Sequence, residues 1–207
     1  REEFSQDPAI ASAEEIPLMF LEDVPEPNDP VFYAQRWNFD LVQAREAWTQ
    51  TQGAGVIVAV IDTGVAFEDY TDPVTLRKFG HGPDFRNSAF VYPKDFFGGD
   101  DHPNDDLGHG THVAGTIAEA TNNGLEAAGI ANEALVMPVK ACGFYEDVQK
   151  YGCRADDVAK GIDWAVTNRA DVINLSIGGS SGFSLQQAAI ERAQSAGIVV
   201  VAASGNN

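Results

Sequence analysis

The sequence predicts an α/β fold in which a mainly parallel sheet lies between two layers of helices. Two observations predict it. Residues 56–61, VIVAVI, are a nearly continuous run of β-branched side chains, as a strand buried on both faces of a parallel sheet requires. Downstream, strand-like runs alternate with helical patterns of about 10 to 15 residues, and this alternation is typical of a parallel sheet covered by helices.

The N-terminal part of the chain divides into an extension and the start of the domain. Residues 1–27 are rich in Glu, Pro and Ala and show no sustained period, so we interpret them as an extension or linker ahead of a domain covering residues 28–207. The pattern FDLVQAREAWTQ then predicts an amphipathic helix from Asp40. Its packing residues are expected to be Val42, Ala44, Ala47 and Trp48.

The later elements follow from the same patterns. Residues 66–107 are punctuated by Gly and Pro and are predicted to be loop, and a helix is expected to begin near His109. Ser184 is placed to cap a later helix, and Gly197 is placed to end it. In chain order, the remaining elements are a strand at 134–141, a helix at 154–170, a strand at 171–179, a helix at 184–197 and a strand at 198–204.

Charge and hydropathy exclude several classes of function. The net charge of −18 over 207 residues would repel nucleic acid and anionic membrane surfaces, so neither is expected as a partner. No apolar run is long enough to span a membrane. The chain opens with REEFSQDP, which lacks the regions of a signal peptide, so we expect any export signal to have been removed or never to have been present.

Two cysteines, Cys142 and Cys153, occur in the segment CGFYEDVQKYGC. Their spacing suits a disulfide that closes a loop in an oxidising compartment, and two free thiols are the alternative. Two isolated thiols do not by themselves make a structural zinc site.

Polar residues follow the predicted strands at the sheet edge where sites form in parallel sheets. This edge is expected to hold Asp62, residues 176–179 and residues 205–207. A carboxylate after a buried strand is costly unless it is hydrogen-bonded, and His109 opens a helix at the same edge. An aspartate that accepts the Nδ1 proton of a histidine fixes the imidazole tautomer for acid–base work. If each residue is considered alone, Asp62 could instead be a loop residue or a helix cap, and His109 could be an ordinary polar residue at a helix start.

Four motifs in order carry a resemblance to a known family. VIVAVIDTGV, NDDLGHGTHVAGTIA, DVINLSIGG and VVVAASGN are similar to the motifs of the subtilisin-type serine peptidases, from about Asn28 to the last residue. The resemblance implies that residues 28–207 are the N-terminal part of a subtilisin-like peptidase domain with a three-layer α/β/α fold, and that residues 1–27 are an N-terminal extension or a propeptide remnant. It also implies an endopeptidase that is secreted as a precursor, acts outside the cell and cleaves protein or peptide substrates through an Asp-His-Ser triad.

The resemblance assigns roles to individual positions. Asp62 matches the triad aspartate, His109 the general base and His112 a supporting histidine that is not the base. Asn206 matches the asparagine whose side-chain amide helps to hold the oxyanion. The extended edge that pairs with the substrate backbone matches Ser176, Ile177, Gly178 and Gly179, where the glycines let the substrate main chain approach closely.

No serine in the sequence lies in the family's nucleophile turn, which is expected downstream of the oxyanion asparagine. We therefore expect a complementary C-terminal segment or chain to carry that serine, and residues 1–207 alone to be inactive and not to fold cooperatively. An inactive product or a peptidase-like binding module is the alternative.

Two other hydrolase classes fit less well. GGSSG, residues 178–182, has the pattern of an esterase nucleophile elbow, but no histidine follows His112, so the esterase order of triad residues cannot be met. A zinc metallohydrolase is the second class. His109 and His112 are three residues apart, whereas the helical zinc motif needs two histidines four residues apart with a glutamate between them.

Calcium is the expected cofactor, and we hypothesise that it raises thermal stability. The segment DFFGGDDHPNDD is oxygen-rich, as hard-cation sites are, although a solvated acidic loop would look the same. The resemblance implies one site with Asp95, Asp100, Asn104 and the carbonyl of His102. It implies a second site with the Asn123 side chain and the carbonyls of Thr121, Leu125 and Ala127, to which Asp84 would add a carboxylate.

Overall fold

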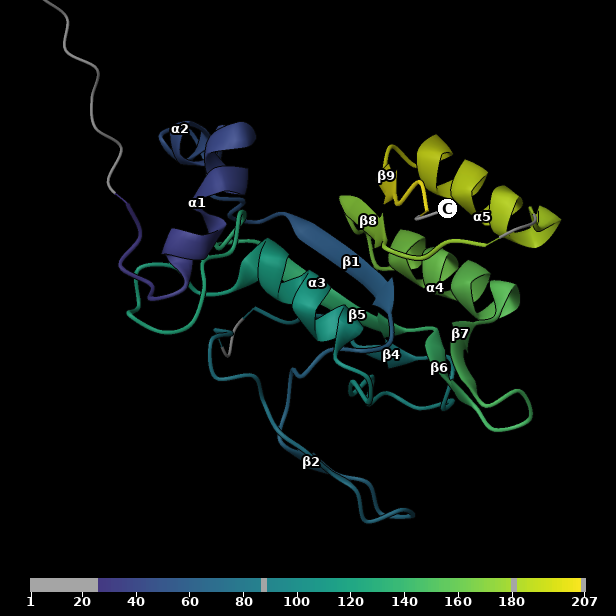
Figure 1. Ribbon diagram of the computed structural model, residues 1–207. Coiled ribbons are helices and arrows are strands. Elements are labelled where there is room, and N and C mark those ends of the chain that lie inside the picture. Colours follow the sequence, from purple (N-terminus) through teal and green to yellow (C-terminus); the bar gives the residue numbers. More distant parts are fainter. Residues whose placement is uncertain (1–25, 87–88, 180–181, 206–207) are drawn as a thin grey trace, which may run out of the picture.

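The computed structural model describes residues 26–86, 89–179 and 182–205 and shows a twisted parallel sheet between helices (Figure 1). The sheet has the order β4-β5-β1-β8-β9, and every neighbouring pair is parallel. The strands are β1 (Ile57–Asp62), β4 (Lys94–Asp95), β5 (Leu135–Lys140), β8 (Val172–Leu175) and β9 (Val199–Ala202). The predicted α/β fold is confirmed.

Helices cover both faces of the sheet. Helix α3 (His109–Ala118) packs on one face, whereas α4 (Ala155–Thr167) and α5 (Ser184–Ser195) pack on the other (Figure 1). Strand β1 contributes to both interfaces. Ala59 and Ile61 join the core cluster under α4 and α5, and Val60 joins the cluster under α3. All three are fully buried, which explains why this strand has no polar face.

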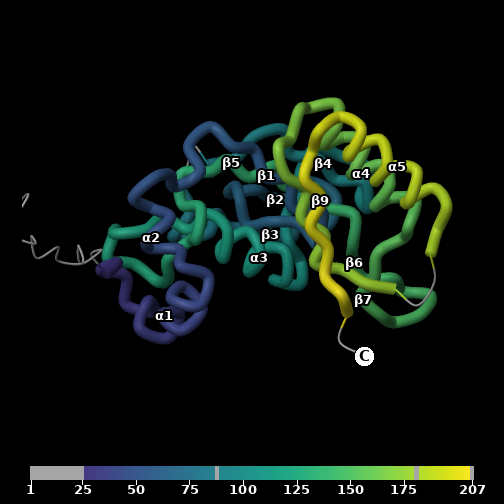
Figure 2. Tube along the Cα trace, turned by 90° about the horizontal axis from the view of Figure 1, so that it is seen from above, coloured from purple at the N-terminus to yellow at the C-terminus, as the bar shows by residue number. Residues whose placement is uncertain are grey.

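The N-terminal helix differs from the prediction. Instead of one helix from Asp40 there are two, α1 (Phe32–Leu41) and α2 (Ala44–Trp48), at the end of the molecule away from α4 and α5 (Figure 2). The break falls at Gln43, whose φ of 55° is left-handed. Of the predicted packing residues, Ala44 and Trp48 do pack in the cluster with Phe32, Phe39 and Ala128, but Val42 and Ala47 are exposed.

The segment predicted to be loop, residues 66–107, contains three very short strands. β2 (Tyr70–Thr71) pairs antiparallel with β3 (Lys78–Phe79), and β4 adds an edge to the main sheet. Each has two residues, which is too short to leave an alternating pattern in the sequence. The prediction of loop alone was therefore wrong at these positions.

Several predicted boundaries also differ from those of the structure, which has shorter α4, α5, β8 and β9. The strand expected over 171–179 ends at Leu175, so residues 176–179 lie beyond it. Ser184 is the first residue of α5 and not its cap, because Phe183 occupies the cap position without a side-chain hydrogen bond. Gly197 has a φ of 83° just after the helix end, as predicted for a residue that terminates a helix.

The cysteine pair closes a hairpin. β6 (Cys142–Tyr145) pairs antiparallel with β7 (Lys150–Cys153), and Cys142 and Cys153 lie opposite each other in the ladder. They form a disulfide with a Cα–Cα distance of 4.1 Å, so the disulfide alternative is the one that the structure shows. In the described part of the chain, no helix is long and apolar enough to cross a membrane.

Candidate active site

A pocket of about 590 Å³ opens at the carboxyl ends of β1 and β8. Strand β5 lies on one side of β1, and β8, which follows β5 in the chain, lies on the other side. The strand order therefore reverses at β1. Such reversal points are where parallel sheets bind ligands. The lining residues are Asp62, Thr63, Leu107, His109, Cys142, Tyr151, Gly152, Cys153, Ala155, Val158, Ser176, Ile177, Gly178, Gly179, Phe183 and Gln186.

Asp62 and His109 are in contact in this pocket. Asp62 ends β1 with no exposed surface, and His109 begins α3 with a side chain that is 49% exposed. His109 Nδ1 lies 2.7 Å from Asp62 Oδ1. Because an ionised carboxylate only accepts hydrogen bonds, Nδ1–H is the donor, and this tautomer leaves Nε2 free to accept a proton. The pair therefore has the geometry of a carboxylate-oriented general base.

A second aspartate, Asp105, organises the start of α3. Its carboxylate accepts hydrogen bonds from the backbone N–H groups of Leu107, Gly108 and Thr111 at 2.9–3.0 Å and from the Thr63 hydroxyl at 2.9 Å. Burial would raise the pKa of the Asp105 carboxyl, but the hydrogen bonds from Gly108 N, from the hydroxyl and N–H of Thr111 and from Leu107 N outweigh it and lower the pKa. The ionised carboxylate thus satisfies N–H groups that a helix start leaves unpaired.

The two histidines of the motif face different surroundings. His109 lines the pocket with Asp62, whereas His112 lies further along α3 and lines a second pocket that includes Asp84 and Glu119. The structure therefore separates the two side chains and does not bring them together as metal ligands.

The predicted substrate edge lines the same pocket as the Asp-His pair. Ser176, Ile177, Gly178 and Gly179 follow β8 directly and border the pocket. Gly205 lies next to this edge, since a Cβ on Gly178 would be 3.9 Å from the Gly205 Cα. The predicted oxyanion residue, Asn206, lies outside the described residues.

The disulfide hairpin forms another wall of the pocket, and no pattern in the sequence indicated this. Tyr151 of β7 lines the pocket and donates a hydrogen bond from its hydroxyl to the Asp106 carbonyl at 3.2 Å. Leu107, 49% exposed, lines the pocket from the loop before His109. The spacing of the cysteines pointed to a closed loop, but only the fold shows where that loop lies.

The four residues of the first predicted calcium site lie on one loop, where Asp95 N donates to the Asp100 carbonyl at 3.0 Å and Asn104 N donates to the His102 carbonyl at 2.6 Å. The Asp95 carboxylate accepts from Gly98 N at 2.6 Å, and the Asp100 carboxylate accepts from His102 N at 2.8 Å. Burial raises the pKa of the Asp95 carboxyl to about 6, although the Gly98 bond and the charge of Lys140 lower it. Within the described ranges, no three His, Cys, Asp or Glu side chains converge as metal ligands.

Asn104 of this set contacts a carboxylate that the sequence did not single out. Its Nδ2 donates to Glu68 at 2.9 Å, and the same oxygen of Glu68 lies 2.8 Å from His102 Nδ1. The Asn104 Oδ1 is buried and has no hydrogen-bond partner among the described residues. Glu68 comes from the loop after β1 and leaves no motif that would reveal it.

In the second predicted calcium site, Asp84 is in direct contact with the segment that holds the other residues. Asp84, only 4% exposed, accepts from Asn123 Nδ2 at 2.7 Å and from Ala127 N at 3.0 Å. Thr121 and Leu125 belong to the same turn, where Leu125 N donates to Asn123 Oδ1 at 2.9 Å. The structure thus joins Asp84 to a segment about forty residues away in the chain.

Two further carboxylates surround this turn, and sequence reasoning missed both. Asp29 is 4% exposed and accepts from Asn122 N at 2.8 Å and from Asn123 N at 3.3 Å. Glu119 is half-buried, and burial together with the charges of Asp84 and Glu126 raises the pKa of its carboxyl to about 7. Negative charge is therefore concentrated around residues 121–127.

Comparisons with known proteins show which family the chain resembles. Residues 53–207 match the subtilase family. Thermitase from Thermoactinomyces vulgaris is 37% identical over 87% of this chain and 58% of that protein. An extracellular protease from Xanthomonas campestris pv. campestris is 35% identical over 87% of this chain and 35% of that protein.

A solved structure shares the fold. It is described as a protease from Pseudoalteromonas arctica, and it is 34% identical with a TM-score of 0.71 over 88% of this chain and 60% of that chain. The chain thus spans less than two thirds of each of these relatives. Because the family match covers most of its length, the chain belongs to the subtilase family.

Proposed function

We propose that this chain is the part of a secreted serine endopeptidase that supplies the general base and one wall of the substrate cleft. The observation that carries the proposal is the contact of 2.7 Å between the buried Asp62 and His109, which line the same pocket as residues 176–179. Membership of the subtilase family supports it.

In the proposed mechanism, a serine on a segment outside residues 1–207 is the nucleophile. His109 Nε2 takes the serine proton as the serine oxygen attacks the scissile carbonyl, and the imidazolium then gives that proton to the leaving amine. Asp62 holds the imidazole in the required tautomer and stabilises its positive charge. The Asn206 side chain would donate to the oxyanion of the tetrahedral intermediate.

Residues 176–179 would hold the substrate backbone. They continue from β8 past the end of its ladder and border the pocket beside His109. A Cβ on Gly179 would meet no atom within 4 Å, so the main chain of a substrate has room to approach there. Backbone pairing of this kind recognises peptides with little regard for side chains, which is consistent with broad specificity.

The proposed location is outside the cell. Two relatives are named extracellular proteases. The Cys142–Cys153 disulfide fits an oxidising compartment. We also propose that the enzyme is made as a precursor.

A serine-directed fluorophosphonate tests the function. The complete protein is expected to be labelled and to lose peptidase activity, and His109→Ala is expected to be labelled much more slowly because the serine then has no base. A zinc chelator should leave activity unchanged. The absence of labelling together with inhibition by the chelator would show that the chemistry is not that of a serine peptidase.

We further propose that calcium binds at the turn formed by residues 121–127. Asp84 and Asn123 supply oxygen donors of the kind that calcium prefers, as do the carbonyls of Thr121, Leu125 and Ala127. Asp29, which the sequence patterns did not indicate, adds a carboxylate. Burial raises the pKa of Glu119, and the negative charges of Asp84 and Glu126 raise it further. A cation would offset this second, repulsive contribution. Asp95, Asp100, Asn104 and the His102 carbonyl would form a second site.

Removal of calcium is expected to lower the melting temperature of the complete protein. Calcium at about a hundred times its dissociation constant stabilises a folded protein by about 2.7 kcal/mol. For 150–250 residues that corresponds to about 5–10 °C, and a larger protein shifts by less. The measurement is thermal unfolding with calcium and with a chelator. Asp84→Asn should show a smaller difference than the wild type, and a wild-type melting temperature that the chelator leaves unchanged would contradict the proposal.

A further inference from the structure

Lys140 is a buried cation next to the candidate active site. It is the last residue of β5, is 5% exposed, and lies opposite Asp62 in the β1–β5 ladder. A buried ammonium group is costly unless it is paired and hydrogen-bonded. We therefore expect the ammonium group of Lys140 to have a charged partner and hydrogen-bond acceptors.

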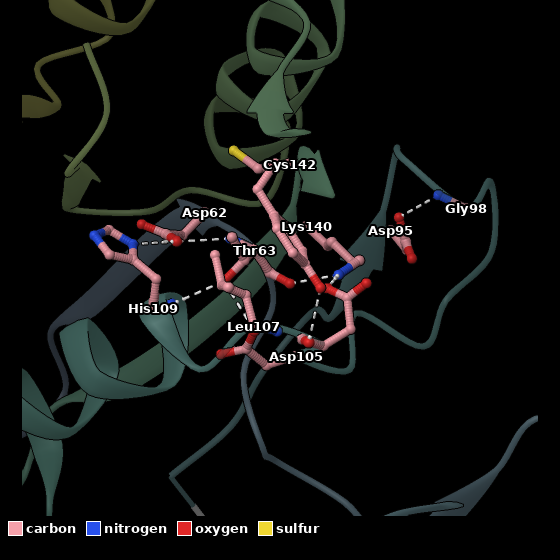
Figure 3. Close-up of polar contacts among 12 residues, drawn as sticks. Asp62, Thr63, Asp95, Gly98, Asp105, Leu107, His109, Lys140 and Cys142 are labelled. Atoms are coloured by element: carbon pink, nitrogen blue, oxygen red, sulfur yellow. Dashed lines mark hydrogen bonds and ion pairs between the residues drawn. The ribbon is translucent and has the colours of Figure 1, made fainter. Parts of the chain in front are cut away.

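Its partners belong to the two segments that carry Asp62 and His109. Lys140 Nζ donates to the carbonyl of Thr63, the residue after Asp62, and to the Asp106 carboxylate at 2.8 Å. Asp106 lies three residues before His109, and its side chain is only 17% exposed. One ammonium group thus ties the end of β1 to the loop that leads into α3 (Figure 3).

A short series of hydrogen bonds connects the partners of Lys140 to the Asp62–His109 pair. Thr63 N donates to Asp62 Oδ1 at 2.7 Å, and this is the oxygen that contacts His109. The Thr63 hydroxyl donates to Asp105 and accepts from Gly110 N, both at 2.9 Å. Figure 3 shows His109, Asp62, Thr63 and Lys140 joined in succession by these contacts. A shift of Thr63 would therefore move the accepting oxygen of Asp62 relative to the imidazole.

We infer that Lys140 is a positioning residue for the Asp62–His109 pair, holding the two segments at the separation that the proton transfer needs. The inference rests on the proposed peptidase function, because only then does the separation govern turnover. Lys140 touches neither the imidazole nor the substrate edge in the contacts described, so it acts through Thr63 and Asp106.

The test compares Lys140→Met and Lys140→Arg with the wild type in the complete peptidase, using a soluble peptide substrate. Methionine keeps much of the side-chain volume and removes both hydrogen bonds, so kcat should fall about 10- to 100-fold, as small misplacements of catalytic groups do. KM should stay within about threefold, because the substrate edge is untouched. Arginine keeps the charge and two or more donors and should recover at least half of the loss on a logarithmic scale.

A matched control is Lys160→Met. Lys160 also pairs with carboxylates, Asp156 and Asp157, but it is exposed on α4. It should leave kcat within twofold of the wild type. A folded Lys140→Met with kcat within twofold of the wild type, or a loss equal to that of Lys160→Met, would overturn the inference.

Two further measurements keep the outcome decisive. If Lys140→Met does not fold, Asp106→Asn leaves the lysine in place and weakens one of its two anchors, so kcat should fall about threefold to tenfold at constant KM. An unchanged kcat would then overturn the inference. The proton resonance of His109 Nδ1–H reports the pair without any turnover. It should shift or broaden in the Lys140 or Asp106 variant and remain unchanged in Lys160→Met.

The resonance also separates the two hypotheses. A wild-type protein that cleaves no peptide and takes up no fluorophosphonate would refute the peptidase function, whereas an altered resonance would still support the positioning role. Active wild type with an unaltered resonance and turnover in the variants would refute the positioning role alone.

Discussion

Replacement of Asp62 by asparagine is expected to lower kcat of the complete peptidase by roughly four orders of magnitude, the loss seen when a triad aspartate loses its charge. The amide can donate as well as accept, so it no longer selects the tautomer with Nδ1–H, and it does not stabilise the imidazolium. Because Asp62 is fully buried and contacts His109 at 2.7 Å, little water is available to replace the carboxylate.

The measurement is steady-state hydrolysis of a peptide substrate with matched circular dichroism spectra. Asp171→Asn is a suitable control, because Asp171 also accepts a backbone hydrogen bond, from Ile57 N at 2.8 Å, but at the opposite end of β1. It should change kcat by less than threefold. Activity of Asp62→Asn within tenfold of the wild type would exclude Asp62 as a triad residue.

Replacement of Gly110 by alanine is expected to have the second largest effect. Gly110 is buried in the first turn of α3, and an added Cβ would overlap the Gly64 carbonyl oxygen and come within 3.0 Å of the Asp62 Cβ. The Gly64 carbonyl belongs to the backbone and the Asp62 side chain is fully buried, so neither has room to shift. Helix α3 must therefore move away from the end of β1. We expect kcat to fall at least about 100-fold. The free energy of unfolding should fall by about 1–3 kcal/mol, as overpacking of a core does.

Peptide hydrolysis and denaturant unfolding of Gly110→Ala check both effects. Gly80→Ala is the matched control, since a Cβ there meets its nearest atom at an ordinary 3.8 Å and the residue is exposed. Equal activity of the two variants would mean that the contact of α3 with β1 does not set the catalytic geometry.

Much of the fold was predictable because the relevant patterns are local. The buried run in β1 and the amphipathic patterns of α4 and α5 record which side chains face the core, and each lies within one element. The helix break at Gln43 and the two-residue strands β2 and β3 were not predictable. A left-handed residue and a two-residue ladder leave no periodic pattern, and their geometry depends on the loops that pack around them.

The site was predictable to a similar extent. The order of the motifs indicated Asp62 and His109, and the spacing of Cys142 and Cys153 indicated a closed loop. Asp29, Glu68 and the wall formed by Tyr151 were missed, because each contacts partners far away in the chain and none belongs to a motif.

The sequence alone therefore determined the class of fold, since this follows from local patterns. It also predicted the acid–base pair and the calcium ligands, through motifs that resemble those of a known family. The tertiary structure alone decided how these groups meet. It brought Asp62 to 2.7 Å from a histidine 47 residues away, joined Asp84 to Asn123, and buried Lys140 between Thr63 and Asp106. The physical reason is that such contacts depend on how separate strands and loops pack, and hydrophobic periodicity within one element carries no information about its distance from another.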